Sequence, residues 1–276
     1  MSERPTNSCG PFLKYPGGKR ALLDSYKEFF PESSTGRYIE PMVGGGAIFF
    51  NWSSRWDSGS IISDKNSDLV NCYRELKRDS YIVAAQLSAL IDHYNECSDK
   101  RGFFEGVRSS FNIGERSAAN FIFMNRCGFN GLVRYNSKGE FNVSWGQRSK
   151  KVLEEVLIAG SILSQDSVTI RDSEDFSWVL MVAQPGDLVY FDPPYLSEKG
   201  FVSYSAGGFS LGDHIRLKEV ALELVSRGVS VRISNAASVE ARELYTGFSV
   251  VDMSARRPIN CQGSGRGEAA EILVCG

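Results

Sequence analysis

Short runs rich in Val and Ile recur between longer helical patterns, and this alternation most constrains the fold of the 276-residue chain. Strands that alternate with helices favour a parallel sheet with helices on both faces. We therefore predict an α/β protein with one doubly wound, seven-stranded sheet, whose last two strands form a hairpin through residues Arg256–Glu268. The predicted strands are Arg37–Glu40, Ser60–Ser63, Ser167–Arg171, Leu188–Phe191, Ser230–Ser234, Ser249–Met253 and Glu271–Cys275.

The alternation stops between about Ser67 and Leu163, where helical patterns and one polar, glycine-rich loop, Gly128–Arg148, replace the strands. We therefore predict that residues 67–160 form an inserted, mostly helical domain, and that residues 1–66 and 161–276 together form the sheet domain. The predicted helices are Lys19–Phe30, Ala47–Trp56, Ser67–Arg78, Tyr81–Cys97, His214–Ser226 and Val239–Tyr245.

Charge is unevenly distributed along the chain. The net charge is −2, yet Lys100–Lys151 holds ten cations and three anions. A basic block in an otherwise acidic chain indicates a localised surface that binds a polyanion. A solvated surface that is basic by chance is the alternative interpretation.

Cysteine and apolar content exclude several classes of protein. The six cysteines form no CxxC pair and there are only two histidines, which argues against a zinc site or a disulfide framework. No apolar run has the roughly 18 residues of a membrane span, and the first residues do not resemble a signal peptide. We expect a cytoplasmic protein with reduced cysteines.

A glycine turn, Gly44–Gly46, follows the first predicted strand and precedes a helical pattern. Such a turn lets the backbone approach a ligand at the carboxyl edge of a sheet, although it can also be merely structural. Asp64 ends the second strand, where an acid can accept hydrogen bonds from ribose hydroxyls; a helix cap is the alternative role. The turn and the acid fit either NAD or S-adenosylmethionine, since both contain adenosine. Lys19 follows another Gly-Gly turn that lacks the spacing of an ATP-binding loop.

The tetrapeptide Asp192–Tyr195, "DPPY", ends the fourth predicted strand in a stiff corner. The Asp192 carboxylate and the Pro193 carbonyl are two acceptors that can converge on an exocyclic amine and localise the nitrogen lone pair. Tyr195 can stack on the flat ring that carries the amine. Positioning and electrostatics of this kind suit direct methyl transfer from a sulfonium. A rigid loop corner is the structural alternative.

With these features the chain resembles the Dam-type DNA N6-adenine methyltransferases, the alpha group with the cofactor segment first and DPPY late. The resemblance implies a Rossmann-like methyltransferase sheet with an inserted target-recognition domain, S-adenosylmethionine as cofactor and duplex DNA as partner. It implies methylation of N6 of a flipped adenine in GATC or a related short site, by a monomer or by a dimer on DNA, without a metal or a membrane. The matching segments are "KYPGGK" (Lys14–Lys19), "EPMVGGG" (Glu40–Gly46), "SDKNSDL" (Ser63–Leu69), "FNGLVRYNSKGEFNV" (Phe129–Val143), "DPPY" (Asp192–Tyr195), "ISN" (Ile233–Asn235) and "ARRPIN" (Ala255–Asn260).

The resemblance also implies roles for individual residues, with Lys19 near the cofactor carboxylate, Lys14 at the first base of the site and Arg134 on a guanine edge. The implied catalytic residues are Asp192, Pro193, Pro194 and Tyr195. The implied cofactor-binding residues are Tyr15, Lys19, Glu40, Pro41, Gly44, Gly46, Asp64 and Asp192. The implied DNA-binding residues are Lys14, Asn130, Leu132, Arg134, Asn136, Ser144 and Arg148. Ser144 and Arg148 replace a proline and an aromatic residue that are common in the family, which bears on sequence specificity.

Four other functions remain as alternatives. A dinucleotide-dependent hydride-transfer enzyme accounts for the glycine turn and Asp64 but not for DPPY. A non-catalytic DNA-binding regulator accounts for the basic block but not for the amine-binding corner. A cytosine N4 methyltransferase has similar chemistry, and a protein amide methyltransferase leaves the basic block without a role. A cytosine C5 enzyme is excluded because it needs a nucleophilic cysteine, usually after proline, and the chain has no Pro-Cys pair.

Overall fold

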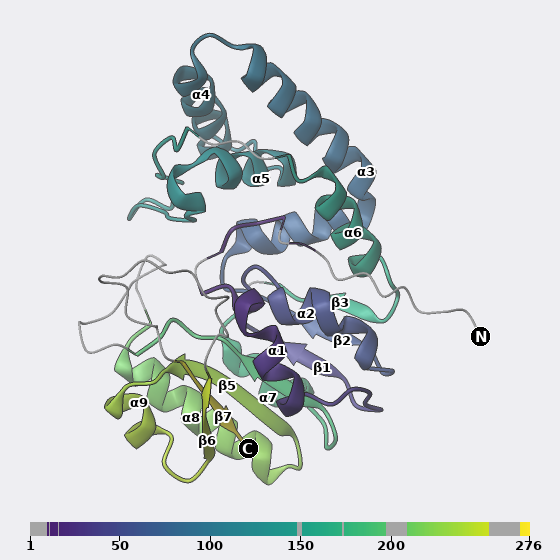
Figure 1. Ribbon diagram of the computed structural model, residues 1–276, viewed down its shortest axis with the longest axis vertical. Helices are drawn as coiled ribbons and strands as arrows, with labels where there is room; N and C mark the ends of the chain where they lie inside the picture. Colours follow the sequence, from purple (N-terminus) through teal and green to yellow (C-terminus); the bar gives the residue numbers. More distant parts are fainter. Residues whose placement is uncertain are drawn as a thin grey trace, which may run out of the picture.

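A single seven-stranded sheet, with the strand order β3-β2-β1-β4-β5-β7-β6, lies in the lower part of the view in Figure 1. The computed structural model describes residues 10, 12–15, 17–147, 151–172, 174–196, 209–253 and 271–276. All seven predicted strands are confirmed, and so is the α/β fold class. The strands are β1 (Tyr38–Glu40), β2 (Ser60–Ile62), β3 (Val168–Ile170), β4 (Leu188–Phe191), β5 (Ser230–Ala236), β6 (Ser249–Met253) and β7 (Glu271–Cys275).

The direction and order of the strands create a crevice next to β1 and β4. These two strands are parallel neighbours, and so are β1 with β2, β2 with β3, and β4 with β5. The chain order reverses between β1 and β4, and ligands of such sheets bind outside the carboxyl ends at that switch point. Only β7 runs antiparallel, between β5 and β6. The predicted pairing of the last two strands is confirmed, while the connection predicted at 256–268 lies outside the described residues.

Alternating strand residues build two apolar cores, one on each face of the sheet. Tyr38 and Tyr190 point into a core formed with α1 (Leu23–Tyr26), α2 (Ala47–Trp52), α3 (Ser67–Glu96) and α6 (Leu153–Leu163). Ile39 and Phe191 point into a second core formed with α7 (Val179–Val182), α8 (Leu211–Ser226) and α9 (Val239–Leu244). Burial of each large apolar side chain stabilises the fold by roughly 1.5–3 kcal/mol.

Helix ends differ from the predictions where local side-chain chemistry decides them. The predicted helix Lys19–Phe30 is three short pieces, the 3-10 turns η1 (Lys19–Leu22) and η2 (Lys27–Phe29) with α1 between them. Helix α2 stops at Trp52 before two serines, which are poor in helix interiors, and continues as the 3-10 turn η3 (Ser53–Arg55). Helix α8 begins earlier than predicted because Ser210 and Asp213 form a capping box.

Helix α3 contains both helices that were predicted for residues 67–97, joined by a kink at Asp79. Asp79 has non-helical dihedral angles, φ −162° and ψ 92°. Its carboxylate accepts hydrogen bonds from the backbone N–H groups of Tyr81 and Ile82, both at 3.0 Å, and so caps the second half of the helix. The first half lies near the sheet, and the second half extends away from it toward α4 (Lys100–Asn112) and α5 (Ala118–Cys127) (Figure 1).

The chain returns from this helical part through α6, which packs along α3. The observed arrangement of α3, α4 and α5 agrees with the helical character that the sequence indicates for this stretch. The exact domain limits, 67–160 against 1–66 and 161–276, stay a prediction.

The described part of the chain contains no helix with the length and apolar character that a membrane crossing requires. In the same residues, no three His, Cys, Asp or Glu side chains are grouped so that they could hold a metal ion. Cys72, Cys97, Cys127 and Cys275 are free thiols, and the other two cysteines lie outside the described residues.

Candidate active site

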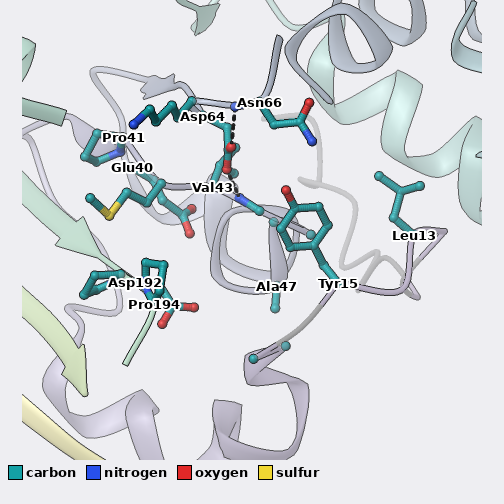
Figure 2. Close-up of a pocket in the computed structure, with 18 of the residues that line it drawn as sticks. Leu13, Tyr15, Glu40, Pro41, Val43, Ala47, Asp64, Asn66, Asp192 and Pro194 are labelled. Atoms are coloured by element: carbon teal, nitrogen blue, oxygen red, sulfur yellow. Dashed lines mark hydrogen bonds between the residues drawn. The ribbon is translucent and has the colours of Figure 1, made fainter. Parts of the chain in front are cut away.

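The carboxyl ends of β1 and β4 open into a cavity of about 1110 Å³ (Figure 2). Small-molecule sites usually measure roughly 300–1,000 Å³, so this cavity has room for more than one ligand group. The structure brings together at its wall every residue that the sequence predicts for catalysis and cofactor binding. These are Tyr15, Lys19, Glu40, Pro41, Gly44, Gly46, Asp64, Asp192, Pro193, Pro194 and Tyr195.

The glycine turn needs its glycines for both conformation and space. Gly44 and Gly46 have φ values of +48° and +67°, which favour glycine. A Cβ at Gly46 would lie 2.6 Å from the ring of Phe50, and one at Gly44 would lie 3.1 Å from the ring of Tyr15. The Tyr73 hydroxyl donates to the Gly44 carbonyl at 2.5 Å and fixes the turn from behind. The backbone of the turn therefore forms a tight, pre-formed wall of the cavity.

Asp64 holds the glycine turn and the start of α3 together. Its two carboxylate oxygens accept hydrogen bonds from the backbone N–H groups of Gly44 and Asn66, both at 2.9 Å (Figure 2). The N-cap of α3 is Asn66, whose side chain accepts from the backbone N–H groups of Asp68 and Leu69. The alternative role of Asp64 as the helix cap is therefore wrong. A carboxylate has about four acceptor positions, so Asp64 can accept further hydrogen bonds from a ligand.

Lys19 lies at the centre of the DPPY corner. Its side chain is 2% exposed, and its Nζ lies 2.9 Å from Asp192 Oδ1 and 3.8 Å from Glu271 Oε2. The same ammonium lies 4.8 Å from the centre of the Tyr195 ring. The Tyr195 hydroxyl donates to Glu271 Oε2 at 2.6 Å, which fixes the ring. Lys19 thus forms an ion pair with Asp192. The contact between Lys19 and a cofactor carboxylate that the resemblance implies stays a prediction.

Burial shifts the protonation of the carboxyl groups in the cavity. Burial raises the pKa of Asp192, and the nearby Lys19 ammonium opposes this rise. Burial also raises the pKa of Asp64, against the two backbone hydrogen bonds. Glu40 is 2% exposed and its pKa lies well above the usual range because of burial, although the Tyr38 hydroxyl donates to it at 2.9 Å. Three carboxyl groups around one cavity suit a ligand that carries a positive charge and hydroxyl donors.

A polar hairpin, which we call the recognition loop (residues 128–147), lies next to the cavity. Its two sides pair at the bridges Gly128–Trp145 and Tyr135–Phe141. Asn130, which has a left-handed backbone with φ +54°, is exposed and lines the cavity edge. Among the described residues that the sequence predicts for DNA binding, Asn130 and Lys14 therefore line the cavity of the DPPY corner.

The other predicted DNA-binding residues of the loop differ in how free their side chains are. Arg134 is exposed, but its guanidinium is oriented by Asn142, to whose Oδ1 and backbone carbonyl it donates at 2.8 and 3.1 Å. The Asn136 side chain accepts from the backbone of Lys138 and Glu140, so it shapes the turn of the hairpin. Leu132 packs half-buried against the core and Ser144 is exposed. Arg148 lies outside the described residues.

Asn125 is a site residue that the sequence did not reveal. It is fully buried in α5, and its Oδ1 accepts from the Lys14 backbone N–H at 2.8 Å. Its Nδ2 donates to the carbonyls of Lys14 at 2.8 Å and Gly131 at 2.9 Å. Lys14, which neighbours Tyr15, is thereby fastened to the recognition loop. An asparagine within the apolar run of α5 is the only local signal of this contact.

The basic block is less uniformly available than the sequence indicates. Of the eight cations that the structure describes in this block, three form ion pairs, and Arg126 is 6% exposed. Arg134 and Lys138 are exposed on the recognition loop, whereas Lys150, like Arg148, lies outside the described residues. The binding of a polyanion by this block therefore depends on few side chains, and it stays a prediction. The ion pairs are Arg101–Glu105, Arg116–Asp68 and Lys151–Asp92.

The sequence is similar to known proteins over nearly its whole length, including both the sheet and the helical part. The family model described as "D12 class N6 adenine-specific DNA methyltransferase" matches residues 15–259. A type II methyltransferase of Lactococcus lactis subsp. cremoris is 38% identical over 277 residues, which is 96% of this chain and 94% of that protein. A type II methyltransferase of Methanocaldococcus jannaschii is 35% identical, with 96% and 98% covered. A DNA adenine methylase of Escherichia coli K12 is 32% identical, with 95% and 94% covered.

Proposed function

Since the chain belongs to the D12 class of N6 adenine-specific DNA methyltransferases, we propose that it transfers a methyl group from S-adenosylmethionine to N6 of a flipped adenine. The proposed substrate is duplex DNA with the site GATC or a related short sequence. The observation that carries this proposal is the position of Asp192, in the wall of a cavity that also holds the glycine turn and Asp64. One cavity can thus place a cofactor and a target amine side by side.

The residues of the cavity fit S-adenosylmethionine. Asp64 has acceptor positions for the ribose hydroxyls, and the glycine turn with Tyr15 forms a narrow wall beside it. The buried carboxyl group of Glu40 and the half-buried one of Asp192 favour the positive end of the molecule. When bound, the cofactor supplies an electrophilic methyl group on a sulfonium.

In the proposed mechanism, the DPPY corner prepares the amine for attack. The Asp192 carboxylate and the Pro193 carbonyl accept the two amine hydrogens, so that the nitrogen lone pair localises toward the methyl group. Lys19 orients the carboxylate of Asp192 at 2.9 Å and favours its charged form. Tyr195 stacks on the base, and its hydroxyl bond to Glu271 holds the ring in place. No proton has to leave before the transfer, because an aromatic amine is a very weak acid. The methylated nitrogen would carry a positive charge and lose one proton to water afterwards.

The recognition loop provides the proposed contact with DNA. N6 of an adenine inside a duplex cannot reach the cavity, so the base must leave the stack at a cost of a few kcal/mol. Asn130 and Leu132 are the proposed side chains near the space that the base leaves, since Asn130 lines the cavity edge. Lys14 and Arg134 are the proposed base readers. In this proposal residues 67–160 serve recognition, together with Lys14 from the segment 1–66, and the rest of 1–66 and 161–276 serves catalysis.

Replacement of Asp192 by Ala tests the mechanism. We expect methyl transfer to fall by at least roughly 100-fold, because the amine loses a charged acceptor that acts in the transition state. The measurement is methylated-base mapping of DNA incubated with the protein and S-adenosylmethionine, which should show N6-methyladenine at one short motif. Asp252→Ala, which removes an exposed carboxylate on β6, is the control and should stay fully active.

Three results would contradict the proposal. Near-normal turnover in a folded Asp192→Ala protein would remove Asp192 from the mechanism. Methylation of cytosine N4, or no methylation of DNA by the unaltered chain, would overturn the proposed reaction. A 2-aminopurine at the target position should brighten on binding if the base is flipped.

A further inference from the structure

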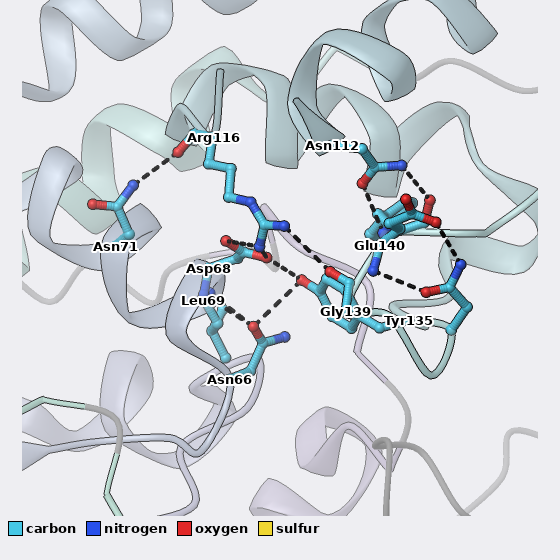
Figure 3. Close-up of polar contacts among 11 residues, drawn as sticks. Asn66, Asp68, Leu69, Asn71, Asn112, Arg116, Tyr135, Gly139 and Glu140 are labelled. Carbon is cyan, nitrogen blue, oxygen red and sulfur yellow. Dashed lines mark hydrogen bonds and ion pairs between the residues drawn. The ribbon is translucent and has the colours of Figure 1, made fainter. Parts of the chain in front are cut away.

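A polar cluster around one buried carboxylate joins the cofactor side of the cavity to the recognition loop (Figure 3). Its centre is Asp68, which is 7% exposed and lies in the first turn of α3. Arg116 Nη1 contacts both carboxylate oxygens of Asp68, at 3.2 and 3.1 Å. The Tyr135 hydroxyl donates to Asp68 Oδ2 at 2.7 Å. One carboxylate therefore binds α3, the connection before α5 and the recognition loop together.

Further contacts extend the cluster on the side of the loop. Arg116 Nη2 donates to the Gly139 carbonyl at 3.2 Å, so the guanidinium touches the tip of the hairpin as well as Asp68. Asn71 on α3 donates to the Arg116 carbonyl at 2.9 Å and fixes the backbone at that residue. The other side of the hairpin is held separately by Asn112, which exchanges two hydrogen bonds with the Phe141 backbone.

On the cofactor side, the cluster begins at the turn that Asp64 holds. Asp64 accepts the backbone N–H of Asn66, and the Asn66 side chain accepts the backbone N–H of Asp68. The Tyr135 hydroxyl also lies 3.4 Å from Asn66 Oδ1. A ligand that bonds to Asp64 would thus be linked to the recognition loop through Asn66 and Asp68, whose carboxylate accepts from Tyr135.

We propose that Asp68 is a positioning residue that couples cofactor binding to DNA binding through Tyr135 and Arg116. This inference rests on the proposed function, because it assigns ligands to the two ends of the cluster. The Asp68 carboxylate fixes the orientation of the hairpin relative to the cofactor turn. Each ligand then stabilises the arrangement that the other one needs, and the coupling is equal in both directions.

The test compares DNA affinity with and without sinefungin, an unreactive analogue of S-adenosylmethionine. Fluorescence anisotropy of a labelled duplex that contains the methylation site gives both dissociation constants for the full chain. For the unaltered protein we expect the analogue to tighten DNA binding by at least about fivefold, which is the lower end of typical coupling. For Asp68→Asn and Tyr135→Phe we expect the ratio of the dissociation constants for DNA without and with sinefungin to fall below about two.

Two readouts separate positioning from general destabilisation. Affinity for sinefungin alone should stay within about threefold in both variants, because no contact at the glycine turn is removed. The KM for DNA should rise while kcat at saturating DNA stays within about threefold, since the DPPY corner is unchanged. Glu105→Gln, which breaks the exposed pair with Arg101 on α4, is the matched control and should keep the unaltered ratio.

The inference is overturned if sinefungin does not change the DNA affinity of the unaltered protein. It is also overturned if sinefungin tightens DNA binding by both variants as much as it does for the unaltered protein. If Asp68→Asn fails to fold, Tyr135→Phe, which removes a single hydroxyl, decides alone. Failure of the proposed function is a different result, in which the unaltered protein neither methylates DNA nor binds sinefungin.

Discussion

At the scale of single residues, the cavity concentrates carboxyl groups that are poorly solvated. Glu40 is the most affected, because burial holds its pKa well above the usual value and the Tyr38 hydroxyl only partly compensates. A carboxyl group of this kind prefers its protonated form in the empty protein. A positively charged ligand would favour the ionised form. The free-energy cost of burying the Glu40 carboxylate is therefore greatest when no ligand is bound.

Replacement of Glu40 by Gln should therefore stabilise the empty protein, and more so as the pH rises. Between the ordinary glutamate pKa and the raised native value, the folded protein keeps a proton that the unfolded chain has lost, so stability falls with increasing pH. A glutamine at this position does not titrate, so it causes no such loss of stability, and its side-chain oxygen can still accept the hydrogen bond from the Tyr38 hydroxyl. Thermal denaturation of both proteins between about pH 5 and pH 8 checks this. A Tm difference that is the same at every pH would show that Glu40 is ionised when folded.

Which site residues can be predicted depends on whether their role is local. Asp192 and the glycine turn follow from short motifs at strand ends, and the structure brings them together. The pairing of Lys19 with Asp192 and Glu271 joins three distant segments, and no local pattern contains it. Asn125 and Asp68 likewise act on partners far along the chain, so their residue type alone gave no signal.

At the scale of elements, the recognition loop combines residues that shape it with residues that point outward. Asn136 and Asn142 serve the hairpin itself, the first by forming the turn and the second by orienting Arg134. Arg134 and Lys138 are exposed. The guanidinium is held in a fixed direction, as bidentate contact with a guanine edge requires, whereas no such geometry is needed for a lysine that meets phosphate.

Arg134→Ala and Lys138→Ala should therefore have different effects. Arg134→Ala should cost roughly 1–3 kcal/mol on the preferred site and relax discrimination at one base pair. Lys138→Ala should weaken binding to all sequences alike. Relative methylation rates on the preferred site and on sites with one changed base pair measure this. Unchanged relative rates for Arg134→Ala would mean that the loop does not read sequence through this residue.

Element prediction succeeded where periodicity is strong and failed where a single side chain sets the boundary. The strands were predicted because each is a short run rich in apolar residues. The central strand β4 is buried at all four positions, whereas the edge strands β3 and β6 are partly exposed. The sequence shows two helical patterns on either side of the kink in α3. Because Asp79 caps the second helical segment, that segment begins without an intervening loop. Helices α4 and α5 were predicted only as a helical region, since their buried faces depend on contacts with each other and with α3.

At the scale of the whole molecule, a net charge of −2 makes DNA binding depend on the local distribution of charge. Cations that meet phosphates release counterions, so the logarithm of the binding constant should fall with the logarithm of salt by roughly 0.9 per phosphate contact. We expect a clear salt dependence in anisotropy titrations despite the acidic pI of about 5.9. Lys151→Ala should flatten the slope, since its exposed pair with Asp92 is weak and exchangeable.

The matched control for this experiment is Lys27→Ala, which removes an exposed lysine of η2 and should leave the slope unchanged. Equal slopes for all three proteins would show that Lys151 makes no contact with a phosphate. A slope near zero for the unaltered chain would exclude an electrostatic mode of DNA binding.

Because α6 packs along α3, the chain leaves the sheet and returns to it at neighbouring points. If residues 67–160 read the target sequence, as proposed, this geometry would allow an evolving lineage to exchange that whole segment by recombination and acquire a new target sequence without rebuilding the sheet. Contacts that cross between the exchanged segment and the rest of the chain set the condition for a successful exchange, because an incoming segment must bring an equivalent of Asn125 to hold the backbone of Lys14. Chimeras that retain this asparagine should therefore inherit the sequence preference of the donor, and those that lack it should bind DNA without methylating it efficiently.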